Sequence, residues 1–249
     1  MTKIKYYSHY KMDSSVAGLF LYAKLAQLAY ARRMTVDEVA SCGIPSIVEI
    51  VYRKSDCGAE VHAIVTDKTL YFVFTGSDDA LDWYHDAQLA RVQFADASAN
   101  VHKGFMIQYK SVQGFIRELS NKFKSLSIVA VGHSSGAALS FITKCDISHF
   151  VNAKVDCIGF GCPRIGDKAF AAYVTQSLGM SLRVVNDNDL ISSLPSNLRG
   201  YRHCGLEVTI RSPTLWNSIR RWAAPLLYRI EEHYIATYVK ILDGMAAPH

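Results

Sequence analysis

The chain has 249 residues, of which 50% are hydrophobic and 20% are charged, and its mean hydropathy is +0.08. This composition excludes a disordered chain, a collagen and a coiled coil, and it supplies enough apolar surface for one sizeable core without metal or disulfide cross-links. The net charge of +5 comes from 27 basic and 22 acidic residues with no run of five or six like charges, so nucleic acid is not an expected partner.

The first predicted element is an amphipathic helix over residues 15–33, capped near Asp13-Ser14-Ser15. A secretory signal peptide is the alternative, because the apolar stretch 16–23 follows several lysines and precedes an A-x-A pattern. Lys24 and Gln27 interrupt that stretch, which favours the helix. No uninterrupted apolar run reaches 18 residues, so no transmembrane segment is predicted, and the compartment is left open.

A β-branched strand over residues 47–52 is predicted next. Residues 60–66 and 70–74 follow as an antiparallel hairpin joined by Asp67-Lys68. Helical spacing of apolar residues then runs over 104–124.

The second half of the chain alternates predicted strands and helices. Residues 127–131 are wholly apolar, which is typical of a strand buried on both faces of a parallel sheet. Because strands separated by helices require crossovers, the sheet is expected to be largely parallel and flanked by helices. No linker or internal repeat divides the chain, so residues 1–249 are expected to form a single α/β domain. The further predicted elements are helix 135–145, strand 155–160, helix 168–177, strand 182–185, candidate strand 206–210 and helix 233–242.

The six cysteines make up about 2% of the chain and include no C-x-x-C pair. They do not form the pattern of a disulfide scaffold, and most of them are predicted to be buried thiols. No spacing of histidine, cysteine or acidic residues resembles a zinc or calcium site, so no metal is expected.

The sequence Gly132-His133-Ser134-Ser135-Gly136 is a G-x-S-x-G motif between the apolar strand and the helix that follows it. At such a tight turn the two glycines are needed because side chains there would collide as the backbone reverses. The turn exposes the Ser134 hydroxyl beside the free N–H groups of a helix start, where negative charge is favoured. Ser134 is therefore a candidate nucleophile, and the alternative is a serine that only caps the helix.

A serine nucleophile needs a histidine to take its proton and a carboxylate to orient that histidine. Asp187 and Asp189 both follow the predicted strand 182–185, and the residues alone do not decide between them. The downstream histidines are His203, His233 and His249, of which the last is the chain's final residue.

Several separated motifs resemble the fungal-type (class 3) lipase family of the α/β-hydrolase fold, and the resemblance covers most of the chain. The matching segments are Phe74-Thr75-Gly76-Ser77, Trp83, Val101-His102-Lys103-Gly104-Phe105, the G-x-S-x-G motif, the stretch 159–166, Asn188-Asp189-Leu190-Ile191 with Leu194-Pro195, and His233 with Tyr234 and Tyr238.

The resemblance implies a catalytic triad of Ser134, Asp189 and His233, and it favours these residues over Asp187 and His203. It also implies an oxyanion hole formed by the backbone N–H groups of Ser77 and Ser135, with the Ser77 hydroxyl as a further candidate donor. Each such donor is typically worth about 10²–10³ in rate.

The segment after Ser77 corresponds to the family's lid, and here it carries four aspartates in residues 78–86. A polar lid favours soluble short-chain or aryl esters, whereas Leu81, Trp83 and Tyr84 leave open an apolar stripe. The alternative is a solvated acidic helix face that has no bearing on substrate choice. The stretch 211–229 mixes arginines with tryptophans and leucines, so it is either a surface helix or a contact with an anionic membrane surface.

The expected function is a serine hydrolase that cleaves carboxylic esters, as a triacylglycerol lipase or carboxylesterase. A phospholipase acting at membrane surfaces and a non-catalytic binding module with the hydrolase fold are the alternatives. The expected partner is a small-molecule ester or a lipid, with transient contact to a lipid surface. Gly159-Phe160-Gly161 lacks the third glycine of a dinucleotide-binding turn, which falls at Arg164, so no cofactor is expected.

Overall fold

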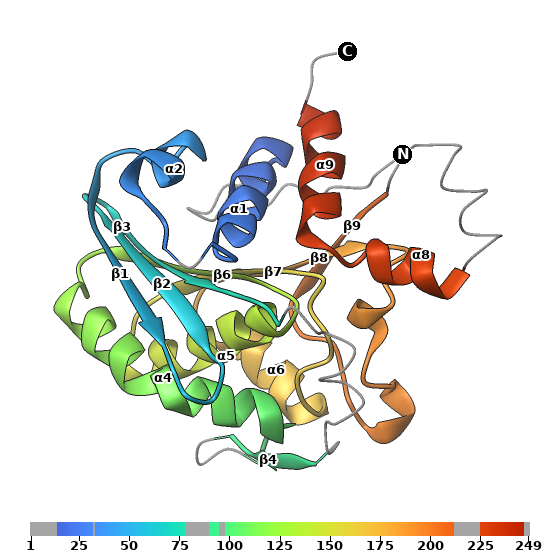
Figure 1. Ribbon diagram of the computed structural model, residues 1–249. Coiled ribbons are helices and arrows are strands. Elements are labelled where there is room, and N and C mark those ends of the chain that lie inside the picture. Colours follow the sequence, from blue (N-terminus) through green and yellow to red (C-terminus); the bar gives the residue numbers. More distant parts are fainter. Residues whose placement is uncertain (1–13, 32, 78–89, 95–97, 212–224, 247–249) are drawn as a thin grey trace.

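The computed structural model describes residues 14–31, 33–77, 90–94, 98–211 and 225–246. Its centre is a seven-stranded sheet in the order β1-β2-β3-β6-β7-β8-β9 (Figure 1). Strand β2 is antiparallel to both β1 and β3, and β3, β6, β7, β8 and β9 run parallel to one another. The bounds of the strands are Ile47–Lys54, Glu60–Thr66, Thr69–Phe74, Ser127–His133, Val155–Phe160, Ser181–Asn186 and Leu206–Ile210.

Helices cover both faces of this sheet (Figure 1). The helices α4 (Lys103–Lys122), α5 (Ser135–Phe150) and α6 (Lys168–Gln176) lie on one face, where α5 packs on β6 and β7. The other face carries α1 (Val16–Leu28), α2 (Val36–Ser41) and α9 (Ile235–Ala246), with α1 and α9 side by side. Each layer has its own apolar core, and β6 contributes to both, with Ala130 on one side and Val129 on the other. The predicted α/β fold with a mostly parallel sheet flanked by helices is confirmed.

The first helix begins as predicted and ends earlier. Ser15 is its N-cap, and the Ser15 hydroxyl accepts from Gly18 N–H at 3.1 Å. The helix was expected to reach residue 33 but ends at Leu28, because the Ala29 carbonyl accepts from the Thr75 hydroxyl at 2.8 Å instead of continuing the helix. The apolar stretch 16–23 lies within this helix, and Leu19 and Ala23 are fully buried in the core.

The elements of the structure that were not fully predicted from the sequence are short. The helix α8 (Pro225–Glu231) overlaps the end of the stretch 211–229, where a surface helix was one of the two predictions. Neither α2 nor the two-stranded sheet of β4 (Arg91–Gln93) and β5 (Asn100–His102) was predicted. Two 3₁₀ turns, Ile191–Ser193 and Asn197–Arg199, were also missed. These elements are too short for periodicity to reveal them. None of the helices in the described ranges is long and apolar enough to cross a membrane.

All six cysteines lie in the described ranges and are free thiols, and all except Cys57 are buried, as predicted. Burial raises the pKa of Cys145 and of Cys157 to about 12. These thiols therefore stay protonated at neutral pH and act as small apolar side chains.

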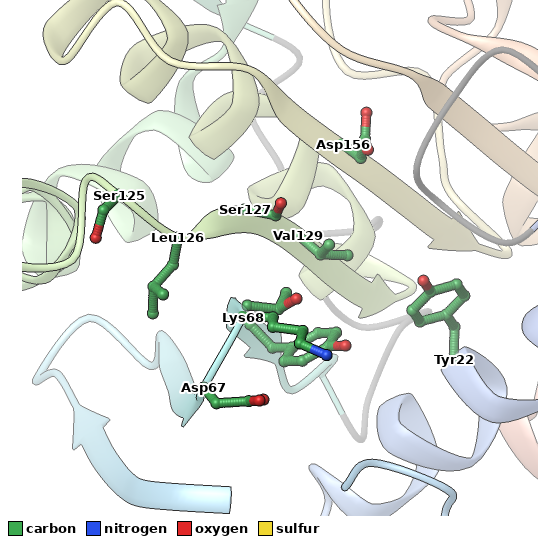
Figure 2. Close-up of a pocket in the computed structure, with 10 residues that line it drawn as sticks. Tyr22, Asp67, Lys68, Ser125, Leu126, Ser127, Val129 and Asp156 are labelled. Carbon is green, nitrogen blue, oxygen red and sulfur yellow. The ribbon is translucent and has the colours of Figure 1, made fainter. Parts of the chain in front are cut away.

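A cavity of about 560 Å³ opens beside the amino ends of β3 and β6 (Figure 2). Its lining includes Tyr22, Lys68, Tyr71, Ser127 and Asp156. The G-x-S-x-G motif follows the carboxyl end of β6. The cavity and the candidate nucleophile therefore lie at opposite ends of the same strand.

Candidate active site

Ser134 occupies the turn between β6 and α5 and has a strained backbone, with φ 55° and ψ −126°. A non-glycine residue persists in such a conformation only where its surroundings hold it there. A Cβ atom at Gly132 would lie 2.3 Å from the carbonyl carbon of Gly136, and one at Gly136 would lie 2.6 Å from the carbonyl oxygen of Phe74. The predicted need for small residues on both sides of the serine is thus confirmed.

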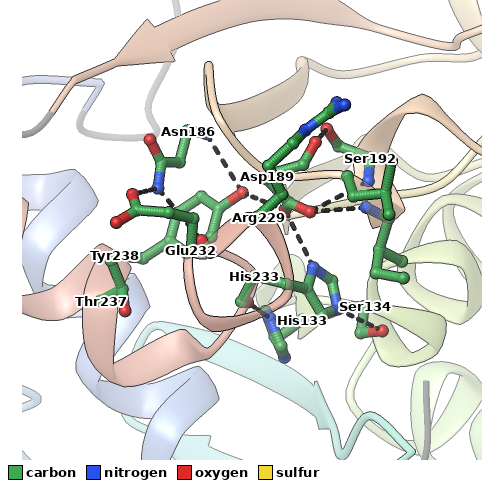
Figure 3. A network of polar contacts seen from close by, with 12 residues as sticks. His133, Ser134, Asn186, Asp189, Ser192, Arg229, Glu232, His233, Thr237 and Tyr238 are labelled. Carbon is green, nitrogen blue, oxygen red and sulfur yellow. Dashed lines mark hydrogen bonds and ion pairs between the residues drawn. The ribbon is translucent and has the colours of Figure 1, made fainter. Parts of the chain in front are cut away.

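The His233 imidazole lies between Ser134 and Asp189 (Figure 3). Its Nδ1 donates to Asp189 Oδ2 at 2.9 Å, and its Nε2 accepts from the Ser134 hydroxyl at 2.9 Å. The exposed fractions of the three residues are only 2% to 4%. The three groups come from the ends of β6 and β8 and from the turn before α9, and they form one continuous chain of hydrogen bonds.

The Asp189 carboxylate is fixed by three further donors. Its Oδ1 accepts from the backbone N–H groups of Ile191 at 2.8 Å and Ser192 at 3.2 Å. Its Oδ2 accepts from the Tyr238 hydroxyl at 2.6 Å. Burial, together with the charge of Asp189, raises the pKa of Tyr238 well above its usual value, so the phenol remains a donor. The carboxylate is therefore held in one orientation toward His233.

The alternative candidates for the acid and the base are not part of this chain of hydrogen bonds where the structure describes them. Asp187 forms an ion pair with Arg211 at 2.5 Å. His203 is half-buried, and desolvation, with Arg183 and Arg164 nearby, lowers its pKa to about 3. His249 lies outside the described residues. Among the described candidates, the structure brings together Ser134, Asp189 and His233.

Ser77 and Ser135 also meet beside the nucleophile. Ser77 N–H donates to Ser135 Oγ at 2.9 Å, and the two hydroxyl oxygens are 3.2 Å apart. Gly76 permits this approach, because a Cβ there would lie 2.6 Å from the His133 carbonyl oxygen and 3.2 Å from Ser134 Cβ. Ser135 is the first residue of α5, so its N–H has no acceptor within the helix.

His133 and Tyr30 are part of the site, although neither of them was predicted to have a role. His133 Nε2 donates to the His233 backbone carbonyl at 2.7 Å, since a carbonyl oxygen only accepts. Its Nδ1 then accepts from the Tyr30 hydroxyl at 2.6 Å. Burial lowers the pKa of His133 well below its usual value, so the ring stays neutral, as both contacts require. Only the motif position of His133 could have pointed to it, because Tyr30 is 103 residues away.

Gly161 is a further residue of the site, and it makes room for the hydrogen bond between Asp189 and His233. Its φ is +57°, and a Cβ there would lie 2.8 Å from Asp189 Oδ2 and 3.0 Å from His233 Cε1. The glycine after β7 therefore leaves the space that Asp189 and His233 fill. Within the described ranges no group of three or more histidine, cysteine or acidic side chains is placed to hold a metal ion.

The two segments that were predicted to bear on substrate choice are described in part or not at all. Residues 78–86, the predicted lid, lie outside the described residues, as do residues 212–224 of the basic stretch. Arg229 is described, and its Nε donates to the Asn188 carbonyl at 3.4 Å (Figure 3). Its own carbonyl accepts from Leu190 N–H at 3.3 Å. Arg229 thus braces the loop that carries Asp189.

Known proteins resemble this chain in sequence. The family model described as lipase (class 3) matches residues 71–198, which is just over half of the chain. A lipase of Rhizomucor miehei is 29% identical over 219 residues, covering 81% of this chain and 60% of the relative. A secreted mono- and diacylglycerol lipase of Fusarium solani is 27% identical, covering 79% and 56%. The chain thus spans less than two thirds of the length of these curated relatives.

Solved structures show the same fold. A triacylglycerol lipase whose catalytic centre is formed by a serine protease triad superposes with a TM-score of 0.68 at 25% identity, covering 77% of this chain and 78% of that one. The triacylglyceride lipase of Rhizomucor miehei gives a TM-score of 0.66 at 27% identity, with 77% and 78% covered. The lipase of Rhizopus microsporus var. chinensis gives 0.71 at 23% identity, with 78% and 74% covered. By its sequence and its α/β-hydrolase fold, the chain belongs to the class 3 lipase family.

Proposed function

We propose that this protein hydrolyses carboxylic esters through Ser134, His233 and Asp189. The observation that carries the proposal is the continuous hydrogen-bond chain from Asp189 Oδ2 through His233 to Ser134 Oγ, with 2.9 Å at each step. A serine hydroxyl becomes an effective nucleophile only when an oriented base takes its proton. His233 is the one base in contact with Ser134 among the described residues.

The reaction proceeds in two halves. Ser134 Oγ attacks the ester carbonyl carbon as its proton passes to His233 Nε2, and the carbonyl oxygen becomes an oxyanion. Collapse of this tetrahedral intermediate breaks the bond to the alcohol, which leaves with the proton from His233. Water, deprotonated by His233, then attacks the acyl-enzyme, and the acid is released as Ser134 regains its proton.

The surroundings favour each charge that develops. The Asp189 carboxylate stabilises the imidazolium that forms at His233, and it keeps its orientation because Tyr238, Ile191 and Ser192 donate to it. The oxyanion lies near the N-terminus of α5, where the helix dipole is positive. We assign the N–H groups of Ser77 and Ser135 to the oxyanion hole, each typically worth about 10²–10³ in rate.

The substrate class we propose is the acylglycerols, with simple carboxylic esters as surrogates. The names of the relatives, a lipase and a secreted mono- and diacylglycerol lipase, support this class. We further propose that residues 1–249 act as a single hydrolase domain, because Ser77, Ser134, Asp189 and His233 come from separate parts of the chain and must converge on one carbonyl.

The test is a series of p-nitrophenyl esters and acylglycerols of increasing chain length, measured below and above their solubility. We expect hydrolysis by the wild type, and a loss of several orders of magnitude in Ser134→Ala without unfolding. The matched control is Ser140→Ala, because the Ser140 hydroxyl is also in α5 but donates to the Ala137 carbonyl at 2.7 Å and takes no part in the triad. A Ser134→Ala variant with near-normal turnover would overturn the proposal, as would a fluorophosphonate that fails to label Ser134.

A further inference from the structure

The backbone N–H of Ser77 already has an acceptor in the substrate-free protein. It donates to the Ser135 hydroxyl oxygen at 2.9 Å. The proposed reaction requires the same N–H to donate to the oxyanion. A single N–H makes one strong hydrogen bond, so the Ser135 hydroxyl and the substrate oxygen compete for it.

The Ser135 hydroxyl stands close to both proposed donors. Its oxygen is only three bonds from the Ser135 backbone nitrogen, and it contacts Ser77 N directly. The exposed fraction of Ser135 is 5%, so this oxygen is largely shielded from water. The substrate oxygen must also accept from the Ser77 N–H, so it needs the place on that donor that the hydroxyl now holds.

The backbone beside Ser77 leaves little freedom to relieve this competition. Gly76 is so closely packed that a Cβ there would lie 2.3 Å from the Tyr30 hydroxyl and 2.6 Å from the His133 carbonyl. The Ser135 side chain, by contrast, moves by rotation about one bond. The Ser77 hydroxyl, 3.2 Å away, offers the displaced group another partner.

We propose that the Ser135 hydroxyl is an internal occupant of the oxyanion hole, which holds Ser77 N–H in the free enzyme and is displaced by the substrate's carbonyl oxygen. This inference rests on the proposed function and concerns the side chain of Ser135, whereas the assignment above concerns its N–H. The free energy of the hydrogen bond that is lost on displacement reduces the net stabilisation of the transition state. Removing the hydroxyl therefore raises kcat/KM by about 2- to 10-fold.

The experiment compares the wild type with Ser135→Ala, which removes the hydroxyl and keeps the backbone N–H. We expect kcat/KM for p-nitrophenyl acetate to rise about 2- to 10-fold, and an alkyl trifluoromethyl ketone, which forms an oxyanion with Ser134, to bind more tightly by a similar factor. Ser140→Ala is the matched control and changes neither quantity. Thermal unfolding of each variant checks that the fold is retained.

A second readout does not depend on turnover. In the NMR spectrum of the substrate-free protein, the chemical shift of the Ser77 amide proton should change little with temperature, as expected for a hydrogen-bonded N–H. Ser135→Ala should make that chemical shift more dependent on temperature. A fall in kcat/KM and in ketone affinity in Ser135→Ala would overturn the inference, because it would make the hydroxyl a donor to the oxyanion. Unchanged values would overturn it as well.

These outcomes separate the inference from the function on which it rests. If the wild type hydrolyses esters and Ser135→Ala brings no gain, only the inference fails. If the wild type hydrolyses no ester and Ser134 takes no fluorophosphonate, both fail together.

Discussion

His133 Nε2 donates to the backbone carbonyl of His233 at 2.7 Å, so the residue before the nucleophile holds the main chain of the base. The two imidazole rings lie 4.7 Å apart between centroids. The turn at Ser134 and the turn at His233 are therefore connected twice, once through the Ser134 hydroxyl and once through His133.

We expect His133→Leu to lower kcat by about 10- to 100-fold, because a base that shifts by even 1 Å loses its alignment with the nucleophile. His133→Gln keeps an amide donor and an acceptor, and should recover part of the loss. Steady-state kinetics on a soluble ester, with thermal unfolding in parallel, separates the effect on alignment from the effect on folding. Equal kcat in the two variants would contradict a positioning role for His133.

Tyr238→Phe should lower kcat by about 10-fold, since Asp189 loses the donor at 2.6 Å on the oxygen that faces His233. It should also lower the free energy of unfolding by about 1–3 kcal/mol, because Asn186 N–H, which donates to the Tyr238 hydroxyl at 3.1 Å, is left buried without an acceptor. Tyr234→Phe is the control, as Tyr234 is 56% exposed. Equal kinetics and denaturation curves for the two variants would contradict this assignment.

Gly161→Ala should lower kcat/KM by at least about 100-fold, because the added methyl group would lie 2.8 Å from Asp189 Oδ2 and 3.0 Å from His233 Cε1. The φ of +57° adds backbone strain. Gly114→Ala in α4 is the opposite case, because a Cβ there meets nothing within 4 Å, and it should stabilise the fold by about 0.5–1 kcal/mol. Full activity in Gly161→Ala would show that the space beside the hydrogen bond between Asp189 and His233 is not required.

Stability should fall as the pH drops from about 6.5 to about 4.5. Burial lowers the pKa of His62 and of His102 to about 4, and that of His203 to about 3. In this range the unfolded chain binds protons that the folded protein does not, so each histidine contributes stability above pH 6.5 that is lost on acidification, at up to about 1.4 kcal/mol per pH unit.

Urea denaturation at several pH values measures this slope. His62 is the residue to test, because neither of its ring nitrogens has a hydrogen-bond partner among the described residues, and its ring packs 4.7 Å from that of Tyr52. In His62→Phe the free energy of unfolding should fall less steeply as the pH drops, because the contribution of one histidine is removed. An unchanged slope would place the pH dependence elsewhere.

Local signals predicted most of the architecture. The apolar run at the start of β6 and the G-x-S-x-G motif fixed a strand, a tight turn and a helix, because each depends on neighbouring residues. The hairpin of β2 and β3 was also predicted correctly. The three-residue strands β4 and β5 escaped prediction because no periodic pattern fits in so few positions.

By itself the sequence determined the fold class, the position of the candidate nucleophile at Ser134 and, through resemblance, a choice of Asp189 and His233. Only the tertiary structure decided which groups meet: Tyr30 with His133, Tyr238 with Asp189, and Ser77 with the hydroxyl of Ser135. The reason is physical. A turn or a helix start is set by residues close in sequence, whereas these hydrogen bonds join groups 49 to 103 residues apart, and they exist only once the sheet brings its strand ends to one edge.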